Sequence, residues 1–349
     1  MPVLARMLLI WAAALFGCAN ATSAQPVQET IEGAKPVELV FAYFVSDGGY
    51  SYERVIAPFV ERINTEGAGL VEVRLVVNGA LGPDPTAQLD LVRSGVADIA
   101  FIVPGYTPAA LPDHRVIELP GLFNTLREAT LVHHKLASAN MLRGLEEVKV
   151  LGGFATAPES IHTTQPVSTL ADLAGRRIRV NNNMESAMLT EFGARPVVHD
   201  ITEIATGLSK GEIDGAMLPL WPLVEFGAAR IATHHFMLKT CAAPLAIVMN
   251  RKVFEGLSSE VQTIIEEASG DWLTGRFIDT ITDFEDKVLA DLAGNERRTV
   301  VEPSPADIDA ADTIFEAVRN RWAAESTHNA ALLAAAQAEL GRIRSGDVK

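Results

Sequence analysis

The stretch from Arg177 to Trp221 constrains the fold more than any other part of the chain. Short runs rich in β-branched residues alternate in it with runs that carry apolar residues at helical spacing. This pattern is typical of a strand, a helix, a short strand, a second helix and a third strand. Strands joined by helices in this way need right-handed crossover connections. The stretch therefore predicts an α/β fold.

Arg179 lies between two β-branched residues, Ile178 and Val180, in the first predicted strand. Because side chains alternate between the faces of a strand, Ile178 and Val180 share one face and Arg179 takes the other. A buried guanidinium needs a partner, and its planar fork of donors matches a carboxylate. The partner that we favour is an anionic ligand. An internal acid, or a position at a sheet edge, is the alternative that the residues leave open.

A six-residue sequence pattern within this stretch also occurs earlier in the chain. Residues 95–100 and 211–216 share the pattern G-x-x-D-x-A, and each copy precedes an apolar strand that is followed by a proline. Ordinary turn chemistry can produce such a pattern by itself. Since a strand–helix–strand unit also precedes each copy, we interpret them as parts of two similar lobes. Ligands of such sheets bind at the carboxyl ends of the strands.

Length and charge narrow the class of protein further. A chain of 349 residues is long enough for two domains. Its 44 acidic and 29 basic residues give a formal net charge of −15, which argues against nucleic acid and anionic membranes as partners. The net charge does not argue against a small anionic ligand, because the local charge decides a buried site.

Residues 1–24 have the features of a secretory signal peptide. Arg6 supplies the positive charge, and residues 7–17 form an apolar run too short to span a membrane. A lipoprotein signal with Cys18 as the lipidated residue is the alternative. We therefore expect a periplasmic protein. The chain has two cysteines, so that only Cys241 remains after cleavage and no intrachain disulfide is expected. We expect Cys241 to be a buried, inert thiol.

The sequence lacks the common motifs of catalytic and cofactor sites. It has no nucleophile elbow, phosphate-binding loop, dinucleotide fingerprint or H-E-x-x-H zinc motif. We therefore expect a binding protein that is not an enzyme and uses no metal or cofactor. The alternative is an exported enzyme with Glu159, His162 or His199 as acid or base, although no nucleophile accompanies them.

Several short motifs, each weak by itself, occur together in an order and spacing typical of one family. With them the chain resembles, over about residues 41–271, the DctP-type periplasmic solute-binding subunit of tripartite ATP-independent periplasmic (TRAP) transporters. The motifs lie at Asn78–Gly82 (N-G-x-L-G), Leu119–Phe123 (similar to L-P-[YF]-L-F), Leu173–Val180 (L-x-G-x-[KR]-[IL]-R-V), Gly193–Pro196 (G-A-x-P) and Gly211–Gly215 (G-x-[VI]-D-G).

The resemblance implies a two-lobed periplasmic binding protein fold, type II-like, with a cleft between the lobes and a long helix that spans the hinge. It implies that Arg179 grips the carboxylate of a small organic acid, which the protein delivers to the TRAP membrane subunits. A sensory protein that signals to a membrane histidine kinase would share this fold. We expect lobe I at residues 37–152 and about 240–275, lobe II at residues 153–239 and about 276–325, and a C-terminal helix and tail at residues 326–349.

Two departures from the family pattern bear on the ligand. Leu218 stands where many members have an asparagine, and the segment after Phe154 lacks the second arginine of many members. Because both departures remove polar groups, we expect a monocarboxylate, such as a keto, hydroxy or aromatic acid, over a sugar acid or a dicarboxylate. A hinge or core position for Trp221 and core packing for Met217 are the alternatives. The expected ligand contacts are Arg179, Trp221, Phe44, Tyr106, Ser160, Asn182 and Met217.

Overall fold

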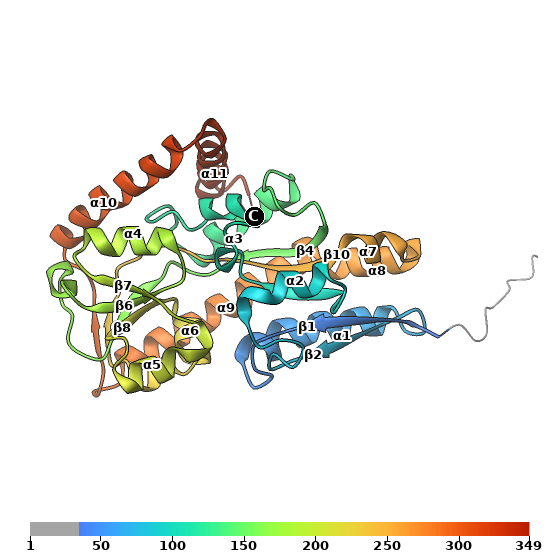
Figure 1. Ribbon diagram of the computed structural model, residues 1–349, viewed down its shortest axis with the longest axis horizontal. Coiled ribbons are helices and arrows are strands. Elements are labelled where there is room, and N and C mark those ends of the chain that lie inside the picture. Colours follow the sequence, from blue (N-terminus) through green and yellow to red (C-terminus); the bar gives the residue numbers. More distant parts are fainter. Residues whose placement is uncertain (1–34, 349) are drawn as a thin grey trace, which may run out of the picture. The chain divides into compact units, whose positions relative to one another are not determined.

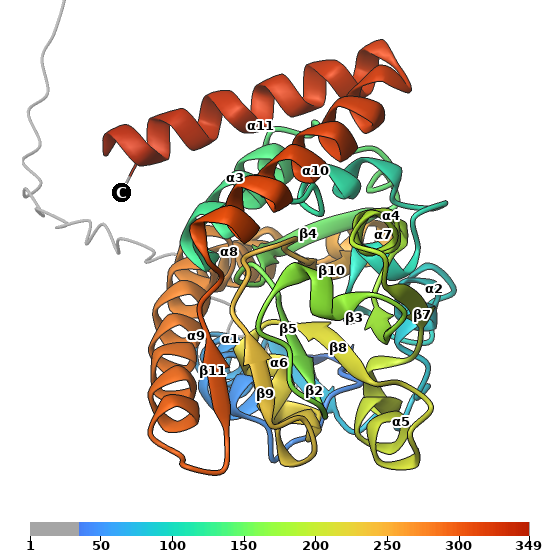
Figure 2. The same ribbon diagram turned by 90° about the vertical axis from the view of Figure 1, so that its left-hand side faces the viewer.

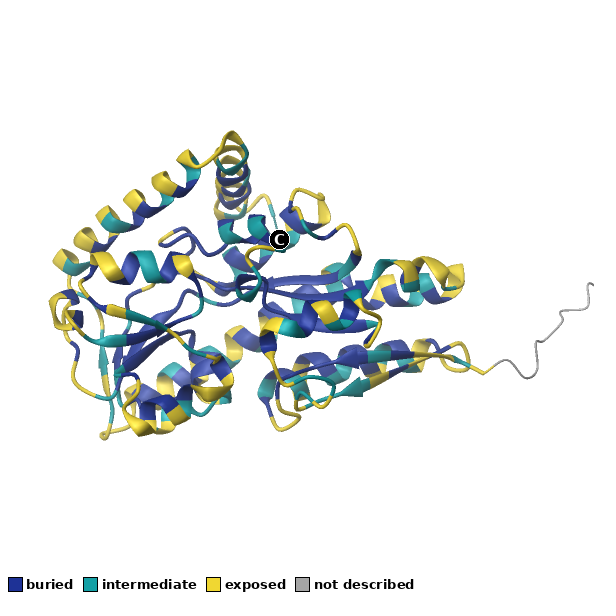
Figure 3. Cartoon of the chain, viewed as in Figure 1, coloured by how far each residue is buried: buried dark blue, intermediate teal, exposed yellow. Residues whose placement is uncertain are grey.

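The computed structural model describes residues 35–348, so the predicted signal peptide and Cys18 lie outside the described residues. The described chain is a mixed α/β structure with a five-stranded and a six-stranded sheet, both packed against helices (Figure 1). Most residues of the strands are buried, whereas the exposed residues lie mainly on the helices and loops (Figure 3). Within residues 35–348, no helix has both the length and the apolar character that a bilayer crossing requires.

The first sheet has the strand order β2-β1-β3-β10-β4. β1 is parallel to β2 and to β3, whereas β10 is antiparallel to its two neighbours, β3 and β4. All residues of β3 are buried, as expected for a strand covered on both faces. The strands are β1 (Val37–Ala42), β2 (Val71–Val76), β3 (Ile99–Ile102), β4 (Val148–Ala155) and β10 (Pro244–Asn250). The helices nearby are α1 (Ala57–Glu66), α2 (Gln88–Arg93), α3 (Leu126–Ser138), α7 (Arg251–Gly256) and α8 (Ser259–Ala268).

The second sheet has the strand order β11-β9-β5-β8-β6-β7. β6 is parallel to β7 and β8, and β5 is antiparallel to β8 and β9. Its strands are β5 (Ser160–Thr163), β6 (Arg177–Val180), β7 (Arg195–Val198), β8 (Gly215–Leu218), β9 (His234–Phe236) and β11 (Thr299–Val301). The helices inserted between these strands are α4 (Asn183–Glu191), α5 (Ile204–Lys210) and α6 (Leu220–Glu225).

The strand–helix–strand–helix–strand prediction for residues 177–221 is confirmed by β6, α4, β7, α5 and β8. Its last element ends earlier than predicted. β8 stops at Leu218, and Pro219 is the N-cap of α6, so Trp221 lies in a helix instead of a strand. Proline lacks the N–H that a continuing ladder needs, and it is well tolerated at the start of a helix.

The helix α9 (Gly270–Ala293) contacts elements of both sheets. It packs on β4 of the first sheet and on β11 of the second, and it also contacts α3 and α6 (Figure 2). Its buried residues include Leu273, Phe277 and Ile281 at intervals of one helical turn, which form the apolar stripe facing the core. This helix matches the long hinge-spanning helix expected from the sequence.

Two C-terminal helices, α10 (Pro305–Ala324) and α11 (Thr327–Ser345), complete the described chain. α10 contacts α4, which lies between strands of the second sheet, and α11 contacts α3 and the 3-10 turn at residues 112–116. Trp322 of α10 is buried in an apolar cluster with Leu332 and Leu340 of α11. The C-terminal segment is therefore packed on the body of the protein.

Asp113 links this 3-10 turn to the C-terminal helix. Its buried carboxylate accepts hydrogen bonds from Arg143 Nε (2.8 Å) and Nη2 (2.5 Å), and it lies 2.9 Å from His328 Nε2. Burial by itself raises the pKa of Asp113, but the hydrogen bonds from Arg143 and His328 more than offset it and lower the pKa to about 2.

We expect Asp113→Asn to lower the melting temperature near neutral pH and to lose this effect in acid. The folded-state pKa lies below the unfolded value of about 3.9, so the stabilisation is present above pH 4 and is lost as the pH falls towards about 2. Thermal melts of both proteins between about pH 2.5 and pH 7 measure the difference. A difference that stays constant across this range would contradict the prediction.

Candidate ligand-binding site

A cavity of about 40 Å³ lies where strand ends of the two sheets approach each other. The first sheet and the segments that follow its strands line one side, and the start of β5, the ends of β6 and β8, and α6 line the other. The lining is mostly apolar, with Tyr106, Thr156, Glu159 and Asn181 as its polar members. The other lining residues are Phe44, Val45, Phe101, Val103, Ile201, Leu218, Pro219, Trp221, Pro222, Phe226, Ala243 and Leu245.

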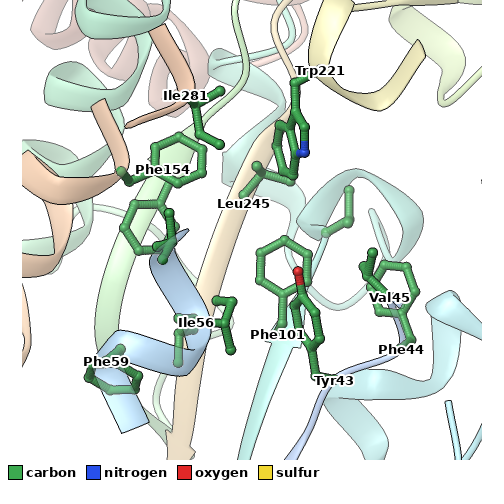
Figure 4. Close-up of a cluster of buried hydrophobic side chains, with 14 of the residues drawn as sticks. Tyr43, Phe44, Val45, Ile56, Phe59, Phe101, Phe154, Trp221, Leu245 and Ile281 are labelled. Carbon is green, nitrogen blue, oxygen red and sulfur yellow. The ribbon is translucent and has the colours of Figure 1, made fainter. Parts of the chain in front are cut away.

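Aromatic rings dominate the cavity walls. Phe44 stacks on Phe101 with a centroid distance of 5.8 Å, and the Trp221 indole meets Phe277 edge-on at 5.9 Å. Figure 4 shows Trp221 reaching towards Leu245 and Phe101, with Phe44 and Val45 beside them. Rings fixed in this way form rigid apolar walls, which suit a flat, weakly polar ligand.

Arg179 adjoins this cavity and is 1% exposed. Ile178 and Val180 pack into the apolar core of the second sheet, so the strand alternation directs Arg179 to the opposite face. Its Nε donates to the His199 carbonyl at 2.9 Å, while its buried Nη1 has no hydrogen-bond partner. Among the described residues, no carboxylate forms an ion pair with Arg179 within 4.0 Å. The guanidinium thus retains donors for an anion.

Two buried carboxyl groups, Glu159 and Glu185, lie in the field of Arg179 without direct ion pairing, and a third, Glu118, lies in the field of both Glu185 and Arg115. Glu159 is 0% exposed; its Oε1 accepts from Asn181 Nδ2 at 2.9 Å and its Oε2 has no partner. Burial, followed by the charge of Glu185, raises the pKa of Glu159 well above its usual range, although Arg179 opposes the shift. Burial also raises the pKa of Glu185 to about 7 and, together with the Glu185 charge, that of Glu118 to about 8. The cluster therefore holds protons near neutral pH.

Glu225 connects the two sides of the cavity. Its carboxylate accepts from Ser51 Oγ at 2.6 Å and from Trp221 Nε1. Ser51 follows β1 of the first sheet, whereas Glu225 and Trp221 belong to α6. A Cβ at Gly49 would collide with the Glu225 carboxylate, so a side chain at this position would displace that carboxylate from its contact with Ser51. Burial raises the pKa of Glu225 to about 7.

The structure brings some of the predicted ligand contacts together and separates others. Phe44, Tyr106 and Trp221 line the cavity, and Arg179 adjoins it through Tyr106. Burial raises the pKa of Tyr106, although the charge of Arg179 opposes this shift. The other predicted contacts lie elsewhere in this form of the protein. Ser160 lines a separate groove, Asn182 caps α4 through its Oδ1, and Met217 is buried in the core of the second sheet.

Sequence reasoning did not assign a ligand-contacting role to Asn181 and Glu159, which supply polar atoms to the cavity. The sequence did contain a signal for Asn181. Arg179 lies two residues before Asn181, and strand alternation places the two side chains on the same face. The sequence had no comparable signal for Glu159. Its contact with Asn181 joins residues 22 positions apart in the chain.

The histidines of the alternative enzyme prediction form no catalytic arrangement. His162 is buried, with Nδ1 at 2.9 Å from His235 Nδ1 and Nε2 at 3.0 Å from the Leu218 carbonyl. Burial and the neighbouring His235 lower the pKa of His162 to about 3. His199 Nε2 lies 3.7 Å from Glu212. Within residues 35–348, no cluster of three or more His, Cys, Asp or Glu side chains has the geometry of a metal site.

Solved structures with the same architecture are two-lobed periplasmic binding proteins. A marine metagenome TRAP solute-binding protein specific for aromatic acid ligands, in complex with 3-hydroxybenzoate, is 25% identical with a TM-score of 0.81. The match covers 88% of this chain and 99% of that one. A TRAP periplasmic solute-binding protein from Bordetella bronchiseptica, with bound (R)- and (S)-mandelate, is 24% identical with a TM-score of 0.79. Here the match covers 88% of this chain and 100% of that one.

The chain belongs to the bacterial extracellular solute-binding protein family 7, whose model, DctP, matches residues 41–326. A relative in this family is the 2,3-diketo-L-gulonate-binding periplasmic protein YiaO of Escherichia coli (strain K12). It is 26% identical over 286 residues, which cover 74% of this chain and 85% of that protein. The family and the fold inferred from the motifs are thus confirmed, and these proteins are solute-binding proteins of transport systems, not enzymes.

Proposed function

We propose that this protein is the receptor of a TRAP transporter for an aromatic or similarly apolar monocarboxylate, which it delivers to the membrane subunits. The observation that carries the proposal is the buried guanidinium of Arg179, with an unpartnered Nη1, beside an aromatic cavity. The ligand carboxylate would accept hydrogen bonds from Arg179, and its apolar part would lie between Phe44, Phe101 and Trp221.

The composition of the cavity wall supports an apolar acid over a sugar acid. Most hydroxyls of a sugar would face Phe101, Leu218 and Trp221, which offer no partner other than the indole N–H already bonded to Glu225. Burying an unpaired hydroxyl costs about 1–3 kcal/mol. The related structure with bound 3-hydroxybenzoate supports the same ligand class.

Binding requires movement of the cavity walls. A cavity of about 150 Å³ accommodates a benzene ring in another protein, whereas the cavity here measures about 40 Å³. We propose that lobe I contains the first sheet and lobe II the second, so that β4 extends lobe I to Ala155. Hinge motion about α9 and the connecting strands would then open the cavity, and the Ser51–Glu225 hydrogen bond would help to close it.

A thermal-shift panel tests this function. We expect benzoate, 3-hydroxybenzoate and mandelate to raise the melting temperature, and succinate and galacturonate to leave it unchanged. A ligand present at about 100 times its Kd and binding only the folded state stabilises by about 2.7 kcal/mol, a shift of several degrees. Calorimetric titration of each hit then measures its Kd. Tighter binding of the dicarboxylate or the sugar acid than of every aromatic acid would contradict the proposal.

A further inference from the structure

Three polar atoms of the buried cluster have no hydrogen-bond partner. They are Nη1 of Arg179, which the proposed carboxylate would satisfy, Oε2 of Glu159 and Oε1 of Glu118, which is not a cavity-lining residue. Glu159 lines the cavity and is 0% exposed. A carboxyl oxygen without a partner in such a place is costly, so its presence indicates a group that bonds to the ligand.

Two asparagines fix the position of Glu159 relative to a second carboxyl. Asn181 Nδ2 donates to Glu159, and the Asn181 backbone N–H donates to Glu185 Oε2 at 2.7 Å. Asn182 Nδ2 donates to the other oxygen of Glu185 at 2.8 Å. The backbone of Glu159 is held as well, because Thr240 Oγ1 donates to its carbonyl at 2.8 Å. Glu159 is thus held in place apart from its Oε2.

The charged and titratable groups around Glu159 come from several elements. Arg179 of β6 and Glu185 of α4 influence it most, followed by Glu118, which comes after the 3-10 turn at residues 112–116. The buried thiol of Cys241 and the hydroxyl of Tyr106 also lie in its field. Glu159 and Glu185 therefore share the Arg179 guanidinium, while Arg115 acts on Glu118, and a bound carboxylate adds one more negative charge beside Arg179.

We propose that Glu159 is a second ligand-binding group, which donates a hydrogen bond as a neutral carboxylic acid to the carboxylate held by Arg179. This inference rests on the proposed function. An ionised Glu159 would repel the ligand, whereas its neutral form supplies the donor that the ligand oxygen needs. The complex then contains the ligand anion and one proton taken from solvent, which resides on Glu159.

Proton uptake has a measurable consequence for affinity. Relative to an open form in which water reaches Glu159, the closed complex binds one additional proton. Affinity therefore falls as the pH rises, by about tenfold per pH unit where the open form is ionised. Glu159→Gln removes this dependence, because the amide is a neutral donor at every pH. We expect the variant to bind tighter than the wild type at about pH 8 and the gap to close towards about pH 5.

Calorimetric titration with 3-hydroxybenzoate at about pH 8, in phosphate and in Tris, counts the protons, because these buffers differ in ionisation enthalpy. We expect an uptake of about one proton in the wild type and close to none in Glu159→Gln. Asp113→Asn is the control: Asp113 is also a buried carboxyl, but it pairs with Arg143 and His328 and lies outside the cavity lining. We expect this control to retain the uptake.

Three results would overturn the inference: no uptake in the wild type, equal uptake in Glu159→Gln, or loss of the uptake in Asp113→Asn alone. Failure of every acid to bind would instead refute the proposed function. If Glu159→Gln does not fold, infrared difference spectra of the wild type supply the test. Ligand binding should then increase the C=O band of protonated carboxyl groups, and an unchanged band would contradict the proposal.

Discussion

Replacement of Arg179 by alanine is expected to abolish measurable binding of aromatic acids while leaving the protein folded. The variant removes the charge-assisted hydrogen bonds to the ligand carboxylate and leaves the buried carboxyls of Glu159 and Glu185 without their nearby cation. Truncating one partner of a buried charge pair costs about 2–5 kcal/mol, so we expect a loss of affinity of at least about 30-fold. Calorimetric titration measures the Kd, and a thermal melt verifies the fold.

Arg177→Ala is the control for this variant. Arg177 lies on the same strand, but its side chain is 41% exposed and pairs with Asp214 at 2.6 Å. Its loss should leave the affinity unchanged. We further expect Arg179→Lys to recover little affinity, because an ammonium lacks the planar fork that holds two carboxylate oxygens. Normal binding by Arg179→Ala would refute the proposed anion site.

Replacement of Trp221 by alanine is expected to have two large effects. The indole is 4% exposed, packs edge-on against Phe277 and donates to Glu225, so its removal should destabilise the protein by about 3–5 kcal/mol. The variant also loses one wall of the cavity. We expect the affinity for 3-hydroxybenzoate to fall by about tenfold or more, since one aromatic contact contributes about 0.5–1.5 kcal/mol beyond its buried area.

Trp322→Ala separates these two effects. Trp322 is 1% exposed and packs between α10 and α11, outside the cavity lining. Its truncation should lower the melting temperature to a similar extent without changing the Kd. Denaturant unfolding and titration of both variants make the comparison. Equal affinities of the two variants would place Trp221 in the core alone, which is the alternative that the sequence left open.

The sequence predicted those parts of the fold that local periodicity determines. Residues 177–221 alternate between the strand period and the helical period, and Gly211 ends α5 at a positive φ of 68° that glycine adopts without strain. Arg179 stood out because a single charge interrupted an apolar strand. The prediction that failed locally was the strand through Trp221, where Pro219 ends the ladder and starts α6.

The parts of the site that the sequence did not predict depend on contacts between distant segments. The meeting of Glu159, Asn181 and Arg179 follows from the pairing of strands that no local pattern specifies. Met217 illustrates the same limit. It was a candidate contact by proximity to Trp221, but β8 turns its side chain into the core, while the next residue, Leu218, faces the cavity. A shift of one residue along a strand reverses the face.

The insertion of β10 between β3 and β4 has a consequence for the order in which the protein can fold. β4 has no other strand partner among the described residues, and β3 keeps one open edge until residues 244–250 arrive. A chain that has emerged only as far as β9 therefore cannot complete the first sheet. Such long-range pairing slows folding.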